Sequence, residues 1–178
     1  MACISKLDRA IAYNCDGGAT GLASALIINK SDIVSFSMTT DGQGVKSLAI
    51  AEADRVFKID TVKRTATASS ALKVNDGAPN AFTHSVSLTI TSAEEVVHSA
   101  ISQAISNGRF VVLAKRASGL CQIYGLYYGL SATAYDRSTH DNGGWATVTL
   151  ETPENVIGED NLLIGSGYYD TLYGAAVG

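Results

Sequence analysis

Charged residues are scarce in this chain: they make up 17% of its 178 residues, against about 25% in a typical soluble domain. Together with 46% hydrophobic residues, this excludes intrinsic disorder, which needs low hydrophobicity and high net charge. The net charge of −4 argues against a general nucleic-acid-binding protein, because such proteins neutralise phosphates with basic residues. A surface this poor in charge is typical of one that copies of the same chain or other partners cover.

Long apolar runs and paired cysteines are also absent. The longest apolar runs, Ala25–Ile28 and Phe110–Ala114, are far shorter than the roughly 20 residues that span a bilayer. The first residues lack the pattern of a signal peptide, so we expect no membrane association and folding in a cytoplasm. The three cysteines, Cys3, Cys15 and Cys121, form no Cys-x-x-Cys pair, which argues against a disulfide framework and a zinc ribbon. We expect reduced thiols, with Cys121 as a small core residue.

The chain has no recognisable catalytic or metal-binding motif. The glycine-rich stretch Gly17–Gly21 lacks the Gly-Lys-Ser/Thr ending of a phosphate-binding loop, so we interpret it as a turn. His84, His98 and His140 are far apart, so no two histidines stand at metal-binding spacing. No Gly-x-Ser-x-Gly nucleophile elbow is present. The sequence therefore predicts no catalytic, cofactor-binding or metal-binding residue, and we expect a protein that is not an enzyme.

Residues 92–107 carry the clearest local signal. Ser92, followed three residues later by Glu95, is a capping box that begins a helix. Asn107-Gly108 is typical of a helix end. Between them, apolar residues recur at helical spacing: Val96, Val97, Ala100, Ile101, Ala104 and Ile105. This pattern predicts a helix over 92–107 with one buried face.

Most other segments show the alternation of β-strands. Residues 84–91 and 145–152 alternate apolar with hydroxyl side chains, which predicts half-buried antiparallel strands. Residues 109–116 and 120–126 flank a short Ala-Ser-Gly turn and predict a hairpin. Residues 25–30 and 33–38 are expected to pair in the same way. We therefore predict a single domain over residues 1–178, mainly β with one helix (α+β), in which an antiparallel β-sandwich or barrel is flanked by that helix.

Residues 56–74 begin as an apolar strand and continue with Thr61–Ala71, which is rich in Thr, Ala and Ser. These residue types favour strands but bury little apolar surface. The segment is therefore typical of an extended arm or hairpin, whose residues 61–74 contact a neighbouring subunit. A solvent-exposed edge hairpin explains the pattern equally well. On the first interpretation, the candidate interface residues are Thr65, Thr67 and Ala68.

Residues 165–178 mix glycine with tyrosine and contain a single charged residue, Asp170. Because exposed aromatic side chains are costly in a monomer, we expect this tail to dock on another surface. Removing residues 166–178 is expected to leave the subunit folded but poorly assembled. The candidate interface residues of this docking tail are Tyr168, Tyr169 and Tyr173.

Three stretches in the second half of the chain resemble small structural proteins of tailed bacteriophages, especially crAss-like and other phages of Bacteroides-type hosts. They are a strand at Arg109–Lys115, a Tyr-Gly-Leu-x-x-Gly-Leu segment at Tyr124–Leu130, and a closing Gly-Trp-x-x-x-Thr-Leu strand at Gly144–Leu150. The resemblance covers roughly residues 86–152. It implies a domain of tail-tube type, in which a β-sandwich or barrel is flanked by a helix.

The resemblance also implies a ring-forming virion protein. Copies would join as a hexamer or dodecamer in the tail tube or the head–tail neck, beside other tail or neck proteins, with DNA as passing cargo. A weakly charged, acidic subunit suits a channel that must not hold phosphates, and strand edges would become the joints of the ring. The alternative is a β-sandwich binding or decoration module of a virion that recognises carbohydrate or protein. Its long loops would supply the contacts, Trp145 beside Asn142–Gly144 first.

Overall fold

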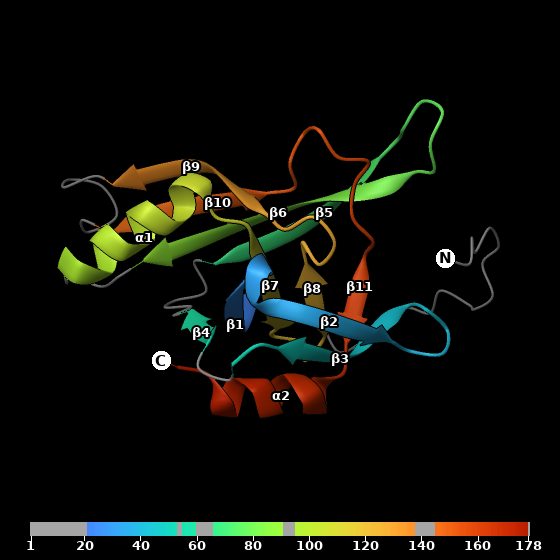
Figure 1. Cartoon of the computed structure of the whole chain (residues 1–178), viewed down its shortest axis with the longest axis horizontal. Helices are drawn as coiled ribbons and strands as arrows, with labels where there is room; N and C mark the ends of the chain where they lie inside the picture. The colour runs from blue at the N-terminus through green and yellow to red at the C-terminus, as the bar shows by residue number, and fades with distance from the viewer. Residues whose placement is uncertain (1–20, 53–54, 60–65, 91–94, 138–144, 178) are drawn as a thin grey trace.

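The computed structural model describes residues 21–52, 55–59, 66–90, 95–137 and 145–177, with residues 95–98 described in their backbone only. The chain folds into two packed β-sheets with two helices, an α+β sandwich (Figure 1). The predicted fold class is confirmed at this level. The prediction of one helix was wrong, because a second helix forms near the C-terminus.

The larger sheet has seven strands in the order β2-β3-β11-β8-β7-β1-β4. All neighbours are antiparallel except β11 and β3, so the sheet is mixed. A 3₁₀ turn at Lys30–Asp32 joins β1 to β2. The strands are β1 (Leu22–Asn29), β2 (Ile33–Met38), β3 (Gly44–Ile50), β4 (Val56–Ile59), β7 (Phe110–Arg116), β8 (Cys121–Tyr124) and β11 (Leu162–Ile164).

The smaller sheet is fully antiparallel, in the order β5-β6-β10-β9. Its strands are β5 (Thr67–Lys73), β6 (Ala81–Ile90), β9 (Ser131–Arg137) and β10 (Ala146–Glu151). Helix α1 (Glu95–Asn107) lies beside β9, and helix α2 (Ser166–Ala175) lies along the far side of the seven-stranded sheet (Figure 1). Each sheet therefore has a helix associated with it (Figure 1).

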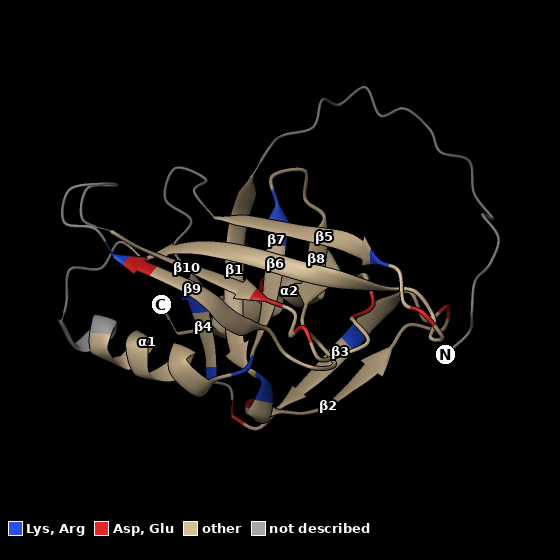
Figure 2. Ribbon diagram, turned by 90° about the horizontal axis from the view of Figure 1, so that it is seen from above, with Lys and Arg blue, Asp and Glu red and all other residues tan. Residues whose placement is uncertain are grey.

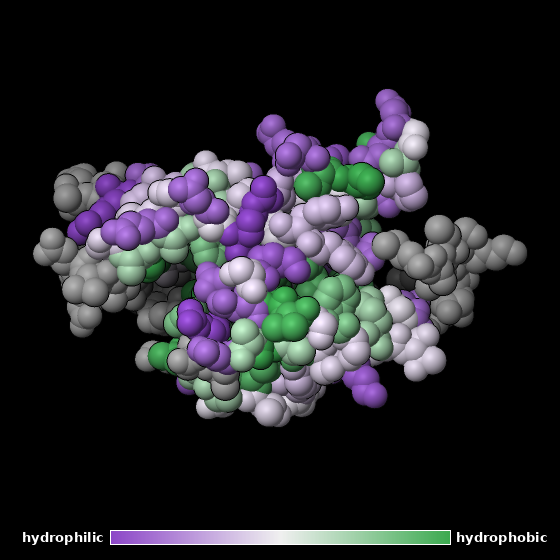
Figure 3. Space-filling model, in the orientation of Figure 1, coloured by the Kyte–Doolittle hydropathy of each residue, from purple (hydrophilic) through white to green (hydrophobic). Residues whose placement is uncertain are grey.

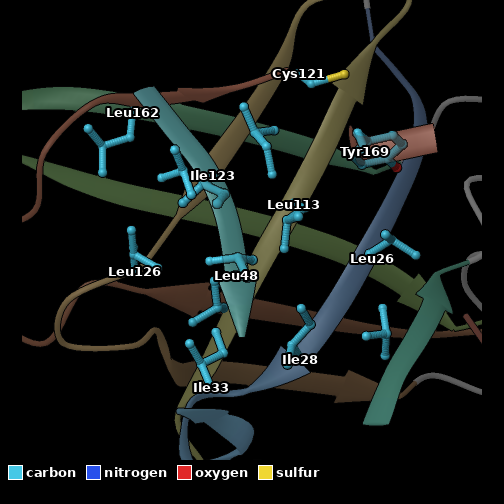
Figure 4. Packing of buried hydrophobic residues seen from close by; sticks show 14 of the residues in the cluster. Leu26, Ile28, Ile33, Leu48, Leu113, Cys121, Ile123, Leu126, Leu162 and Tyr169 are labelled. Carbon is cyan, nitrogen blue, oxygen red and sulfur yellow. The ribbon is translucent and has the colours of Figure 1, made fainter. Parts of the chain in front are cut away.

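The central strand β7 of the seven-stranded sheet is buried on both faces. One face packs against β6 and β10 and forms the inter-sheet core, which includes Val112 and Ala114 of β7. The other face forms the outer core, which includes Val111 and Leu113 of β7 and Tyr169 of α2 (Figure 4). Successive β7 side chains enter different cores, which is why this strand is continuously apolar rather than alternating.

Several elements follow the sequence pattern. The strands predicted at 84–91 and 145–152 are confirmed as β6 and β10, which pair with each other, and the hairpin is confirmed as β7 and β8. The helix is confirmed as α1, although Ser92 of the capping box lies outside the described residues. Its buried face is narrower than expected, because Ile101 and Ile105 pack on the inter-sheet core while Ala104 is exposed. Cys121 is a buried free thiol, as expected.

The predicted pairing of residues 25–30 with 33–38 is wrong. Strand β1 pairs with β7 and β4, whereas β2 pairs with β3 at the other end of the same sheet. The 3₁₀ turn between them carries β2 away from β1, so proximity in sequence does not become a hairpin. The long apolar partner β7 takes the place beside β1 instead.

Residues 56–74 do not form the single arm or hairpin that the sequence predicted, whereas contact of residues 61–74 with a neighbouring subunit stays a prediction. Strands β4 and β5 lie in different sheets and do not pair with each other: β4 pairs with β1, and β5 pairs with β6 over seven residues. Ala66, just before β5, is fully buried in the inter-sheet core. Strands β4 and β5 therefore belong to different sheets of the subunit, and β5 is an edge strand among the described residues, as the alternative interpretation expected.

Candidate assembly surfaces

The C-terminal tail docks on its own subunit. Tyr169 is only 1% exposed, in the outer core, and its hydroxyl lies 2.9 Å from the Oγ atom of Ser24. The Tyr168 hydroxyl bonds both the backbone N–H and the carbonyl of Leu48, each at 3.0 Å. Tyr173 is half-buried and stacks on Tyr169. Intramolecular packing therefore buries Tyr169, and contact of the three tyrosines with a neighbouring subunit stays a prediction.

Charged side chains reinforce this docking. Lys115 Nζ lies 2.7 Å from Asp170 Oδ1, and this hydrogen bond raises the pKa of the lysine. Lys58 Nζ lies 5.1 Å from the centre of the Tyr173 ring, within the range of a cation–π contact. Burial raises the pKa of Tyr169 to about 12. These contacts attach α2 to β4 and β7 of the same chain.

The residues after α2 cover one edge of the seven-stranded sheet. The N–H of Lys58 donates to the carbonyl of Val177 at 2.8 Å, and the N–H of Val177 donates to the carbonyl of Val56 at 2.9 Å. Strand β4 therefore has a partner on both sides, β1 and Val177. Pairing of this kind removes an edge that would otherwise be open to another strand.

Strand β5 is an open edge within the described part of the chain, where it pairs with β6 alone. Of the predicted arm residues, Thr67 and Ala68 lie on this edge, and Thr65 lies outside the described residues. The strand carries no charge before Lys73 and has neither a proline nor a bulge. Monomeric proteins usually protect an edge with such features. An edge without them is suited to pairing with another strand.

Three exposed aliphatic side chains lie at the end of this edge, and we call them the apolar rim: Leu72, Val74 and Ile157 are 60%, 72% and 52% exposed. Polar contacts hold their backbone in place. Lys73 Nζ donates to the carbonyl of Val156 at 2.6 Å, and Asn75 Nδ2 donates to the carbonyl of Ile157 at 3.0 Å. Figure 3 shows hydrophobic surface beside the β5–β6 hairpin at the upper right. The rim is a fixed apolar feature.

Strand β9 is the opposite edge of the same sheet, and the described residues give it one partner, β10. Its charged residues, Asp136 and Arg137, stand at its end (Figure 2). A hollow of about 390 Å³ lies between β9 and α1, and its lining includes Ile105, Ala132 and Tyr135. The four-stranded sheet thus ends in two different open edges, each with apolar surface beside it.

A network of polar side chains lies between the sheets. Gln122, 3% exposed, accepts hydrogen bonds from the Tyr124 hydroxyl and from Arg116 Nη2, both at 3.1 Å. Its amide nitrogen donates to Ser70 Oγ at 3.3 Å and to Asn161 Oδ1. Because Ser70 belongs to β5 and Gln122 to β8, the network ties the edge strand to the seven-stranded sheet.

His84 is the second buried polar group of this region. Its Nδ1 accepts the N–H of Gly125 at 3.2 Å, which leaves the proton of the neutral ring on Nε2. Nε2 is buried and has no hydrogen-bond partner among the described residues. Burial lowers the pKa of His84 to about 4. No cluster of three potential metal ligands occurs in the described ranges.

Sequence reasoning did not find Glu159. Its buried carboxylate accepts the N–H groups of Tyr127 and Tyr128 at 2.9 and 2.7 Å, and burial raises its pKa although these bonds oppose the shift. The tight turn that supplies the two donors begins at Gly125 and ends at Gly129, both with positive φ. The glycine spacing of the Tyr-Gly-Leu-x-x-Gly-Leu segment was the one signal of this turn.

The contacts suggested for a binding module are not brought together in the described part of the structure. Trp145 is half-buried just before β10, and Asn142–Gly144 lie outside the described residues. A hollow of about 220 Å³ at the four-stranded sheet is lined mainly by hydroxyl-bearing residues and Glu151, together with Ala71 and His84, and has no Trp, Tyr or Phe in its lining. The alternative function therefore stays a prediction.

Comparison with known proteins gives no relative: no family model, curated protein or solved structure matches this chain. The two helices of the described residues are too short and too polar to cross a bilayer.

Proposed function

We propose that this chain is a structural subunit of a tailed-phage virion, which self-assembles into rings of the tail tube or the head–tail neck. The observation that carries the proposal is the four-stranded sheet. Its strands alternate in direction, and among the described residues both outer strands, β5 and β9, have a free edge.

An even number of alternating strands suits head-to-tail joining. Strands β5 and β9 run in opposite directions, so a copy placed beside the first by rotation alone sets its β5 antiparallel to β9. The next copy repeats the same joint. A contact between two different surfaces that repeats by rotation closes into a ring when the rotations complete a turn. Hexamers and dodecamers are the expected sizes.

The charge of the chain supports the same function. Strands β5 and β9 are uncharged except at their ends, so few charged side chains would face each other where the two strands pair (Figure 2). The net charge of −4 gives no general attraction for phosphates, which suits a ring through which DNA slides as cargo. The expected location is the virion, in contact with other tail or neck proteins. The resemblance over residues 86–152 and the helix α1 beside β9 support a domain of tail-tube type.

Size-exclusion chromatography with light scattering, followed by negative-stain electron microscopy, tests this proposal. We expect rings from the full chain and their loss in Leu72→Lys, which places a charge on the β5 edge. Leu163→Lys is the matched control, because Leu163 is also an exposed leucine but belongs to the other sheet. A full chain that stays monomeric at high concentration and shows no rings would overturn the proposal.

A further inference from the structure

The hollow beside β9 is lined by uncharged side chains, some apolar and some hydroxyl-bearing. Ile105 of α1 and Ala132 of β9 both pack against the inter-sheet core, so they lie on the inner face of the four-stranded sheet. Thr133, Ala134 and Tyr135 complete the β9 side of the hollow. Ser102 and Ser106 line its helix side, and no charged side chain lines it. The hollow stands directly at the free edge of β9, where an added strand would place its side chains.

Leu72 projects from the same face of the sheet at the opposite edge. Side chains of β5 alternate, and Ala66 and Ala68 pack on the inter-sheet core. Leu72 has the same parity as these two residues, so it points to the inner face as well. It is nevertheless largely exposed, because it lies at the end of the strand where nothing in the described chain covers it.

The backbone groups of Leu72 also face outward from the sheet. The N–H of Thr152 donates to the carbonyl of His84, and Phe82 exchanges two hydrogen bonds with Glu159. The even-numbered residues of β6 therefore direct their polar groups away from β5. Leu72, the antiparallel partner of Phe82, must direct its own N–H and C=O to the open edge.

The same reasoning applies to Ala132. Leu150 is paired with Val86 and directs its N–H and C=O to β6, as the even-numbered residues of β6 direct theirs to β10. The backbone N–H and C=O of Leu150 are therefore not available to Ala132, which stands opposite Leu150 on β9. The N–H and C=O of Ala132 face the open edge. Leu72 and Ala132 thus present free backbone groups and an inward-pointing side chain at opposite ends of one sheet.

Register and charge bring these two residues together. Antiparallel pairing of the end of β5 with the start of β9, before the bulge of β9 at Thr133, places Leu72 opposite Ala132. Lys73 then stands opposite Ser131, so no like charges face each other in this stretch. We propose that the hollow between α1 and β9 receives Leu72 of a second copy of this chain, whose β5 pairs with β9. This inference rests on the proposed ring-forming function and names its joint.

Cysteine cross-linking tests the pairing. Hydrogen-bonded antiparallel partners have Cα atoms about 5.5 Å apart, within the range that a disulfide spans. The double variant Leu72→Cys with Ala132→Cys is oxidised in a full-length background that carries Cys3→Ser and Cys15→Ser, and buried Cys121 is retained. We expect a ladder of reducible bands beyond the dimer, whereas Ala132→Cys or Leu72→Cys alone stays monomeric on the denaturing gel.

The other outcomes separate this inference from the proposed function. Rings that form without any cross-link in the double variant overturn the Leu72–Ala132 joint but leave the ring-forming function standing. A cross-linked dimer from Leu72→Cys alone means that two β5 edges pair symmetrically, which also overturns the joint. A background protein that is monomeric by light scattering overturns both proposals.

Discussion

His84 is the residue whose chemistry the fold changes most. Its ring is 1% exposed, packs edge-on against Tyr124 and keeps one nitrogen without a partner among the described residues. Burial without an acceptor for its second nitrogen favours the neutral form of the imidazole over the charged form. Its pKa of about 4 lies below the ordinary value of 6.5, so the unfolded chain binds the proton more readily than the folded one.

We therefore predict that stability falls as the pH drops from about 6.5 to about 4, because protonation favours the unfolded state in this window. The loss that His84 contributes is on the order of 3 kcal/mol. His84→Asn offers an acceptor near the position of Nδ1 but does not titrate. Urea unfolding at several pH values should show a smaller acid loss in this variant than in the parent. Equal pH dependence in the two proteins would contradict the prediction.

Gly125 allows a second prediction at this scale. Its φ is +76°, and an added Cβ would stand 2.7 Å from Leu130 Cγ, so alanine brings both backbone strain and a clash. Gly119 has φ of +87° with nothing within 4 Å, so alanine there brings strain alone. Thermal or urea unfolding should show that Gly119→Ala costs about 1–2 kcal/mol and Gly125→Ala clearly more. Equal losses would mean that Leu130 moves aside without cost.

At the scale of elements, α2 changes the expected result of removing residues 166–178. The sequence suggested a folded subunit that assembles poorly. In the structure this segment contributes Tyr169 and Ala176 to the outer core and pairs Val177 with β4. Burying one large aromatic side chain alone is worth about 3–5 kcal/mol against alanine. We predict that the truncated chain is unfolded or strongly destabilised by circular dichroism, and a cooperative melt at the parent temperature would contradict this.

Proline substitutions test the orientation of β5. Leu72 directs its N–H to the open edge, so Leu72→Pro should keep the ladder with β6 and block strand addition. Ala71, its neighbour, directs its N–H to β6, so Ala71→Pro should lose a ladder hydrogen bond and melt at a lower temperature. Light scattering and thermal melts should show a folded monomer for the first variant and a destabilised subunit for the second. The reverse order would overturn the assignment of the edge.

The elements that the sequence predicted well are those with a local pattern. The alternation of Val86 and Leu88 and the spacing of Ile101 and Ile105 follow from burial of one face, and the structure confirms both elements. Partners of β1, β4 and β5 depend on contacts between residues distant in sequence, which no local pattern encodes. Helix α2 contains Gly167 and Gly174, poor helix formers, and forms because its tyrosines pack on the outer core.

The candidate site was predicted in part for the same reason. The unusual Thr/Ala composition pointed to Thr67 and Ala68, which the structure places on the open β5 edge. The tyrosines of the tail were assigned to a neighbour because the sequence does not show that β4 and β7 of the same chain receive them. No sequence pattern pointed to Ala132 and Leu72, because only the pairing of the strands places them on opposite edges of one sheet.

At the scale of the whole molecule, the shortage of charge predicts how assembly responds to salt. Interactions between exposed charges are screened within about 10 Å at 0.1 M salt and within about 3 Å at 1 M. The proposed joint consists of backbone hydrogen bonds and aliphatic contacts, so the oligomer fraction measured by light scattering should stay constant or rise between these concentrations. Dissociation at 1 M salt would indicate that charged groups hold the copies together.

Hydrogen bonding at the proposed joint determines which strands meet, but it leaves the tilt between them free. Adjacent strands twist by about −10 to −35° relative to each other, so the same pairing tolerates a range of angles. The circumference of the ring would then depend on how the side chains at positions 72 and 132 fill the space beside α1. A bulkier residue at 132 should therefore change the diameter of the ring rather than prevent ring formation.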